Sequence, residues 1–254
     1  LGGINYSSIE GEGVTIHTRD GRKYRGMVIC KSHSVHVFDD ARTAPRDELH
    51  MEVILHEDVK SKEDVMNLGI DHGDVISIDP HFEYTPSGYV KSRFIDDKAA
   101  VAALFEMIAY FKRNNLKPKY RTLLAFPLYE EIGHGGAYVP EEVSEYVALD
   151  IGLIGPDYHG NETTVSICAK DNYSPYDRGL TNRIILQAKK ANLNYCVDVF
   201  YRYGTDANAA IRAGNNVYAA AFGMACINSH GMERCHISAI EETAKLAIAY
   251  ALDI

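Results

Sequence analysis

The sequence predicts an α/β protein built from two parts, and three observations lead to this. Residues 93–254 alternate between strand and helix patterns, which is typical of helices packed on a central sheet. Residues 1–91 instead show short strand patterns separated by turn residues, which predicts a small β-barrel or sandwich. The length of 254 residues, 46% of them hydrophobic, suits one large or two small domains. We therefore predict a first domain over residues 1–91 and a second over 92–254.

The first part begins with a predicted hairpin. Strand patterns at residues 13–18 and 23–30 flank Asp20 and Gly21, which form a good turn between paired strands. Residues 50–56 alternate apolar and polar side chains and predict a third strand. Ser61 is expected to cap a short helix, because the acidic residue Asp64 follows three residues later. Residues 68–78 then return to a strand pattern.

The second part is expected to open with a helix over residues 97–113, where apolar side chains recur at helical spacing. The elements that follow are strands at 121–128, 145–150, 163–169, 195–201 and 217–222, and helices at 179–192 and 206–213. A last helix is predicted after Ser238, which with Glu241 at the third position forms a capping box.

Composition excludes several kinds of partner. The net charge of -9 argues against a nucleic-acid backbone as a ligand. No apolar stretch approaches the roughly 20 residues of a membrane-spanning helix, so no membrane partner is expected either. The five cysteines are irregularly spaced and form no Cys-x-x-Cys motif. This pattern favours reduced thiols and a cytoplasmic location.

The most informative feature is the adjacent pair Glu130 and Glu131. The pair follows an apolar run and precedes a glycine-rich turn. Continuous apolar runs are typical of buried strands, and open α/β sheets carry their chemistry beyond the carboxyl ends of such strands. Two neighbouring anions repel each other, so a metal ion is the natural partner, with one carboxylate as ligand and the other moving a proton. A solvated surface turn is the ordinary alternative.

Three more places put ligand-type side chains at the ends of predicted elements: Asp96 and Asp97, Asp150, and His236. Taken singly, the aspartates could cap a helix or shape a turn. His236, or His230 in the same segment, could be an ordinary packed or exposed histidine. Together with the glutamate pair they form an oxygen-rich set that contains an imidazole. Such a set suits zinc, cobalt or manganese, and an aspartate can bridge two ions.

Several segments resemble the glutamyl-aminopeptidase and deblocking-aminopeptidase family, also called the TET or cellulase-M-like family. They are Asp-Asp-Lys at 96–98, Glu-Glu-Ile-Gly at 130–133, Ala-Leu-Asp at 148–150, Gly-Thr-Asp-Ala at 204–207 and Cys-His-Ile at 235–237. Members are dinuclear metallo-aminopeptidases that assemble as tetrahedral dodecamers. The resemblance implies a zinc-peptidase-like, three-layer α/β catalytic domain. It also implies an inserted small β-barrel, PA-like, that serves substrate access or oligomerisation.

The resemblance also implies a role for each candidate residue. Asp96 would bridge two divalent ions, zinc or cobalt with manganese as a further option. Glu131 and His236 would ligate one ion and Asp150 the other. Glu130 would be the general base that hydrolyses the N-terminal bond of a peptide substrate. The segment 204–207 would lie near the substrate pocket.

One departure from the family pattern leaves an alternative open. The family places a further metal-ligand histidine, in a His-x-Asp segment, ahead of the β-domain. The histidines in residues 1–91 lack that context, so we expect the N-terminal part of the catalytic domain to be absent from this chain. The alternative function is then a catalytically incomplete scaffold or regulatory relative, although the retained candidate residues oppose it.

Two other enzyme classes fit the sequence less well. A deacylase or carboxypeptidase with the same metal centre usually carries a lid insertion, whereas residues 151–235 show only core strand and helix patterns. A polysaccharide hydrolase needs two carboxylates that flank a glycosidic bond, and adjacent glutamates on one loop are poorly placed for that.

Overall fold

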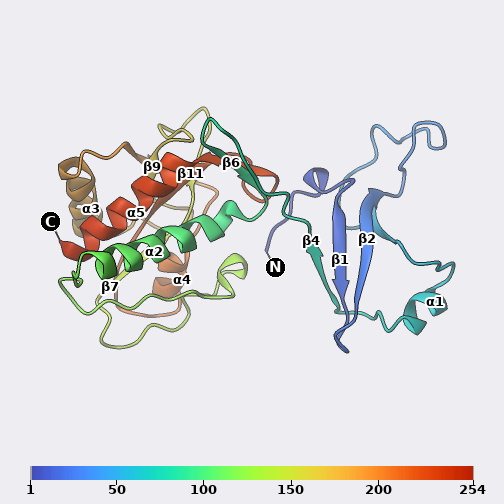
Figure 1. The fold of residues 1–254 in the computed structure, drawn as a ribbon, viewed down its shortest axis with the longest axis horizontal. Helices are drawn as coiled ribbons and strands as arrows, with labels where there is room; N and C mark the ends of the chain where they lie inside the picture. Colours follow the sequence, from blue (N-terminus) through green and yellow to red (C-terminus); the bar gives the residue numbers. More distant parts are fainter. Residues whose placement is uncertain (1, 254) are drawn as a thin grey trace. The chain divides into compact units, whose positions relative to one another are not determined.

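The computed structural model describes residues 2–253, which divide into two compact units (Figure 1). Ile4–His81 form the first, here called the β unit. Gly2, Gly3 and residues 82–253 form the second, the α/β unit. The division after residue 91 that the sequence suggested falls inside β6 (Tyr89–Ser92). This strand belongs to the α/β unit because it pairs antiparallel with β12 (Glu233–His236).

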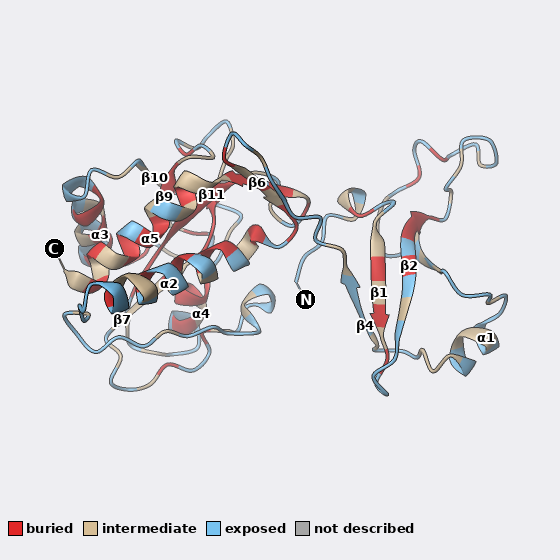
Figure 2. Cartoon of the chain, in the orientation of Figure 1, coloured by how far each residue is buried: buried red, intermediate tan, exposed pale blue. Residues whose placement is uncertain are grey.

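The β unit holds a four-stranded antiparallel sheet in the order β3-β2-β1-β4. Its elements are η1 (Tyr6–Ser8), β1 (Gly13–His17), β2 (Lys23–Cys30), β3 (Met51–Leu55), α1 (Lys62–Asn67) and β4 (Val75–Ile78). Alternate residues Val14 and Ile16 of β1 are buried in a small core (Figure 2). The predicted cap of α1 is confirmed, since the Ser61 hydroxyl accepts the Asp64 N–H at 3.1 Å. Closure into a barrel stays a prediction.

The α/β unit contains a mixed sheet in the order β10-β9-β11-β7, with β8 pairing along β11 beyond β7. Strands β7 and β11 run parallel, and β9 lies antiparallel to β11. The elements not yet named are β5 (Glu83–Tyr84), α2 (Ile95–Arg113), η2 (Glu130–Ile132), β7 (Glu145–Leu149), β8 (Gly152–Leu153), β9 (Val165–Lys170), α3 (Arg178–Lys190), β10 (Tyr195–Val199), α4 (Asp206–Arg212), β11 (Tyr218–Cys226) and α5 (Ile237–Leu252). No described helix is long and apolar enough to span a bilayer.

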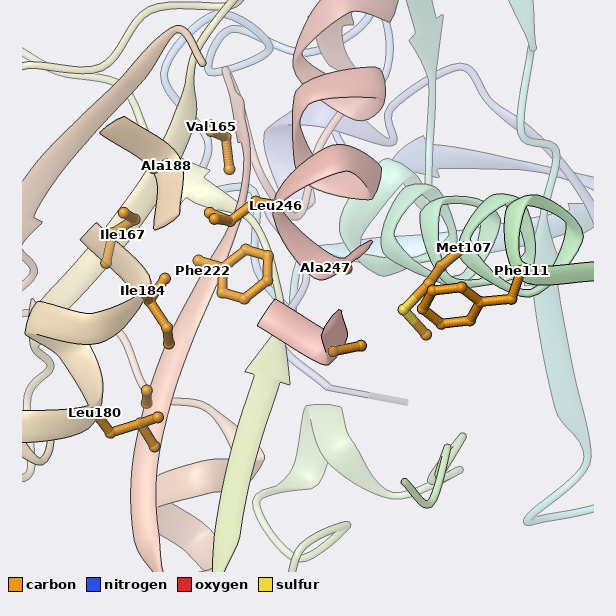
Figure 3. Close-up of a cluster of buried hydrophobic side chains, with 12 residues drawn as sticks. Met107, Phe111, Val165, Ile167, Leu180, Ile184, Ala188, Phe222, Leu246 and Ala247 are labelled. Carbon is orange, nitrogen blue, oxygen red and sulfur yellow. The ribbon is translucent and has the colours of Figure 1, made fainter. Parts of the chain in front are cut away.

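The central strand β11 separates two apolar layers, because successive side chains of a strand point to opposite faces. Ala220 and Phe222 belong to a cluster with side chains of α2, α3 and α5. Figure 3 shows Phe222 among residues of that cluster. Ala219 and Ala221 belong to a different cluster, which contains Ala207 of α4. The sheet is therefore covered by three helices on one face and by α4 on the other.

The predicted strand over residues 121–128 is wrong. The structure assigns no strand there, and large side chains such as Leu123, Phe126 and Leu128 are exposed. The ring of Phe126 stacks on Phe105 of α2 with centroids 5.7 Å apart. An apolar run becomes a strand only where a neighbouring strand offers backbone partners, and local sequence does not show whether one is present. Among the described strands, none pairs with this segment.

Candidate active site

A cavity of about 640 Å³ in the α/β unit gathers residues from separate parts of the chain. It is lined by side chains from the start of α2, from η2, from the end of β7, from the segment before α4 and from the loop between β11 and β12. The predicted residues Asp96, Glu130, Glu131 and Asp150 all line this cavity. The structure thus brings four of the five candidate side chains to one place.

The backbone of Asp150 passes very close to Gly223 of β11, and this places the Asp150 side chain at the cavity. Asp150 directly follows β7, and its backbone N–H donates to the carbonyl of Phe222 at 3.1 Å. A Cβ atom added to Gly223 would lie 1.5 Å from the Asp150 carbonyl oxygen, so only glycine permits this crossing. The Asp150 side chain is 7% exposed, and its Oδ1 accepts the Ile151 N–H at 2.7 Å.

Asp96 is held by Ser229, in the loop between β11 and β12, and by Glu233, the first residue of β12. Its Oδ2 accepts the Ser229 hydroxyl at 3.0 Å, and its backbone N–H donates to Glu233 at 3.0 Å. Glu233 also accepts the backbone N–H of His230 at 3.1 Å. With 1% exposure, Glu233 ties the start of α2 to this loop. Sequence reasoning missed Glu233, because nothing in its neighbourhood distinguishes it from a solvated charge.

His230, which the sequence analysis weighed beside His236 but left out of the ligand set, lies among the carboxylates. Its Nε2 is 3.7 Å from Asp96 Oδ2 and 3.7 Å from Glu131 Oε2. Its Nδ1 lies 2.7 Å from the carbonyl oxygen of Gly3. Because a carbonyl can only accept, Nδ1 carries a hydrogen, and Nε2 is the ring atom that faces the two carboxylates. Ligand histidines in metalloproteins are oriented by a hydrogen bond of this kind.

The structure does not bring His236 to this group. Its Nδ1 bonds the Ser238 hydroxyl at 2.7 Å, its Nε2 bonds the Ser87 carbonyl at 3.0 Å, and its ring packs edge-on against Tyr89. His236 accepts the Ser238 N–H and is the N-cap of α5, so the predicted capping box that starts at Ser238 is wrong. Its neighbour Cys235 is buried in the core.

Burial raises the pKa of every carboxyl group in the cluster, and repulsion by neighbouring carboxylates adds to this rise for Glu130, Glu131 and Asp150. Desolvation is the main cause for Asp96, Glu131 and Asp150, and the last has a pKa well above its usual range. Burial, followed by the negative charge of Asp206, raises the pKa of Glu130 to about 8. These shifts mean that ionising the whole cluster is costly unless a cation offsets the charge.

The donor set fits a divalent cation. Carboxylate oxygens around one imidazole nitrogen suit zinc, cobalt or manganese. Within residues 2–253, no three His, Cys, Asp or Glu side chains are already arranged as a metal site. The fit therefore rests on the chemistry of the donors and on the convergence of Asp96, Glu131 and Nε2 of His230.

Comparison with known proteins identifies the class. A family model of the M42 glutamyl aminopeptidases matches residues 1–246. A putative aminopeptidase of Bacillus subtilis, YhfE, is 40% identical over 251 residues, which are 98% of this chain and 72% of that protein. The chain is therefore a peptide hydrolase of the metal-dependent kind. It belongs to the M42 glutamyl aminopeptidase family, which confirms the resemblance.

Solved structures agree on the fold. A TET aminopeptidase of a marine Thaumarchaeota archaeon superposes with a TM-score of 0.81 at 17% identity, over 99% of this chain and 72% of that one. The Pyrococcus horikoshii TET1 peptidase gives 0.80 at 22% identity, over 100% and 76%. The latter can assemble into a tetrahedron or a large octahedral shell. At such identities the likeness shows the fold alone.

Proposed function

We propose that this chain hydrolyses the N-terminal bond of peptides, with Glu130 as general base beside two divalent ions. The observation that carries this proposal is the convergence of Asp96 and Glu131 on Nε2 of His230, in the cavity that Glu130 also lines. Membership of the M42 aminopeptidase family supports it and does not favour the alternative of a non-catalytic relative.

The proposed ligand roles combine the family resemblance with the positions in the cluster. Asp96 would be shared by the two ions, Glu131 and His230 would hold one, and Asp150 would hold the other. His230 replaces His236 in this assignment because only His230 faces the carboxylates. Zinc or cobalt is the proposed metal, and manganese fits the same donors. Bound divalent ions supply a Lewis acid for the scissile carbonyl and lower the pKa of water in the site.

Glu130 performs the proton transfers. A nearby cation favours the carboxylate over the neutral acid, so loading of the site returns Glu130 to its basic form. Glu130 then accepts the proton of the attacking water and delivers it to the leaving amine. The free amino terminus of the substrate is held by the carboxylates close to the metal ions, which limits cleavage to the first residue.

The organisation of the whole protein is proposed by analogy with the structural neighbours. The α/β unit is the catalytic domain, and the β unit is a small barrel that serves substrate access or oligomerisation. The assembly is a tetrahedral homo-dodecamer, as in the TET structures. We also retain the cytoplasmic location predicted from the cysteines, all five of which are free and buried.

The function is tested with a panel of short peptides that carry either a free or an acetylated amino terminus. We expect release of single N-terminal residues from the free peptides only, because the acetyl group removes the amine that the site holds. A chelator abolishes this release, and added zinc or cobalt restores it. Mass spectrometry of the products identifies the bond cleaved. Equal cleavage of acetylated peptides, or cleavage at internal bonds, would contradict the proposal.

The cavity also carries two cations that favour an acidic N-terminal residue. Arg202 and Arg212 both line it. The guanidinium of Arg212 lies 4.1 Å from the ring centroid of Tyr173, which holds it in place. Tyr173 in turn lies against Gly204, where an added Cβ would be 2.5 Å from the ring. A fixed guanidinium can pair with the carboxylate of a glutamate or aspartate side chain.

Replacing Arg212 by alanine is expected to raise KM for peptides that begin with glutamate by about 10- to 100-fold, the value of one charge-assisted hydrogen bond. Peptides that begin with leucine should show little change. Steady-state kinetics with the two peptide series measures the difference. Arg178→Ala, at an exposed position on α3, is the matched control. Equal losses for both series would show that Arg212 supports the fold and does not select the substrate.

A further inference from the structure

We propose that Asp206 is a positioning residue that clamps the glycine end of the loop 130–136, so that the Glu130 carboxylate stays aimed into the cavity. This inference rests on the proposed role of Glu130. It gives a task to the Gly-Thr-Asp-Ala segment at 204–207, which the ligand assignment leaves without one.

Asp206 contacts the glycine end of this loop. Its Oδ1 accepts the N–H of Gly136 at 2.9 Å. Asp206 is 4% exposed, so water does not compete for this bond. One buried residue thus fixes the turn that follows the base.

The two glycines show how tightly the loop is pressed against α4. A Cβ on Gly135 would lie 2.3 Å from Asp206 Oδ2. A Cβ on Gly136 would lie 2.2 Å from the Asp206 carbonyl oxygen. Real side chains do not tolerate such distances, so the backbone of the loop reaches Asp206 only because these two positions lack a side chain.

Asp206 can act as a clamp because the start of α4 is itself anchored. The Thr205 hydroxyl accepts the Ala207 N–H at 3.2 Å and bonds the Tyr176 hydroxyl at 2.7 Å. Tyr176 lies 3.0 Å from a carboxylate oxygen of Asp171, which is fully buried. A fully bonded, buried network of this kind is rigid. The position of Asp206 is therefore set independently of the loop that it holds.

The negative charge of Asp206 cannot be what helps Glu130 to act as a base. Two carboxylates at close range repel each other, so the charge of Asp206 acts against the ionised form of Glu130. What Asp206 contributes is its hydrogen bond with the loop backbone at Gly136. Asparagine keeps a side-chain oxygen that can accept the Gly136 N–H while it removes the charge, so Asp206→Asn separates the two effects.

The test compares Asp206→Ala and Asp206→Asn with Asp177→Ala. Asp177 is a matched control because it caps α3 and its carboxylate accepts the Leu180 N–H at 2.7 Å. Two quantities are measured, amide hydrogen exchange of the segment 130–137 and steady-state kinetics. We expect Asp206→Ala to speed exchange in this segment about tenfold or more. It should also lower kcat by about 100-fold at nearly constant KM, because a misplaced catalytic group costs that much.

Asp206→Asn should recover most of both losses, and Asp177→Ala should show neither. Unchanged exchange in Asp206→Ala would overturn the proposal, whether or not the preparation is active. Equal losses in the asparagine and alanine variants would overturn it as well, since the charge would then be the feature that matters. If Asp206→Ala does not fold, Gly135→Ala displaces the loop from the same side chain, and wild-type exchange and kcat in that variant would also refute it.

Failure of the proposed function gives a different result. Full activity after removal of the Glu130 carboxylate would refute the role of Glu130. The exchange data would still decide whether Asp206 holds the loop.

Discussion

Glu130→Gln is expected to lower kcat by about two to four orders of magnitude, with KM nearly unchanged. Glutamine keeps the size of the side chain, but it cannot accept a proton from water. The metal ligands stay in place, so metal content and substrate binding should match those of the wild type. Steady-state kinetics and elemental analysis on the same preparation give all three quantities.

Glu141→Gln is the control for this experiment. Glu141 is exposed and lies on the same chain segment beyond the glycine turn. The Glu141→Gln variant should have the kcat of the wild type. A loss of metal in Glu130→Gln would assign Glu130 to the ligands, and a kcat within a few-fold of the wild type would remove it from the mechanism.

The second large effect concerns the choice between two histidines. His230→Ala is expected to weaken metal binding by at least about 100-fold, since it removes a ligand and loss of a ligand's supporting group alone costs 10- to 100-fold. Metal at about 100 times its Kd stabilises the wild type by roughly 2.7 kcal/mol, or a rise in Tm of about 5–10 °C. The variant should lose this rise. Thermal melts with chelator and with added zinc or cobalt measure it.

His236→Ala should behave in the opposite way. His236 caps α5 and bonds Ser87, so its loss costs about 1 kcal/mol of stability in every condition. The rise in Tm on adding metal should remain. If His236→Ala abolishes that rise while His230→Ala keeps it, the original assignment from the sequence is right and the one drawn from the structure is wrong.

Local pattern predicted most elements of the α/β unit but not every ligand position. The periodicity that predicted a helix over residues 97–113 is carried by side chains of α2 itself, so no distant partner is needed to see it. The segment 121–128 failed because a strand depends on neighbours that are remote in sequence. Asp96, Glu130, Glu131 and Asp150 were found because each stands at an element end, where an acidic side chain is conspicuous.

Spacing could not separate His230, in the loop between β11 and β12, from His236, the last residue of β12. They flank Glu233 at three residues on either side, and both precede the last helix. What separates them is the pairing of β12 with β6, which carries His236 to Tyr89 and Ser87. His230 lies in the preceding loop with a positive φ of 63° and turns its ring toward the cavity. Only the three-dimensional register reveals this.

The close crossing at Gly223 has an evolutionary consequence. The position has no side chain to conserve for its chemistry, yet any substitution there would displace the backbone of Asp150 and with it one oxygen donor. Divergence of the proposed metal centre would therefore be constrained at a residue that does not line the cavity. In a set of related chains, a side chain at this position would mark those that had abandoned the Asp150 donor, even where the aspartate itself persisted.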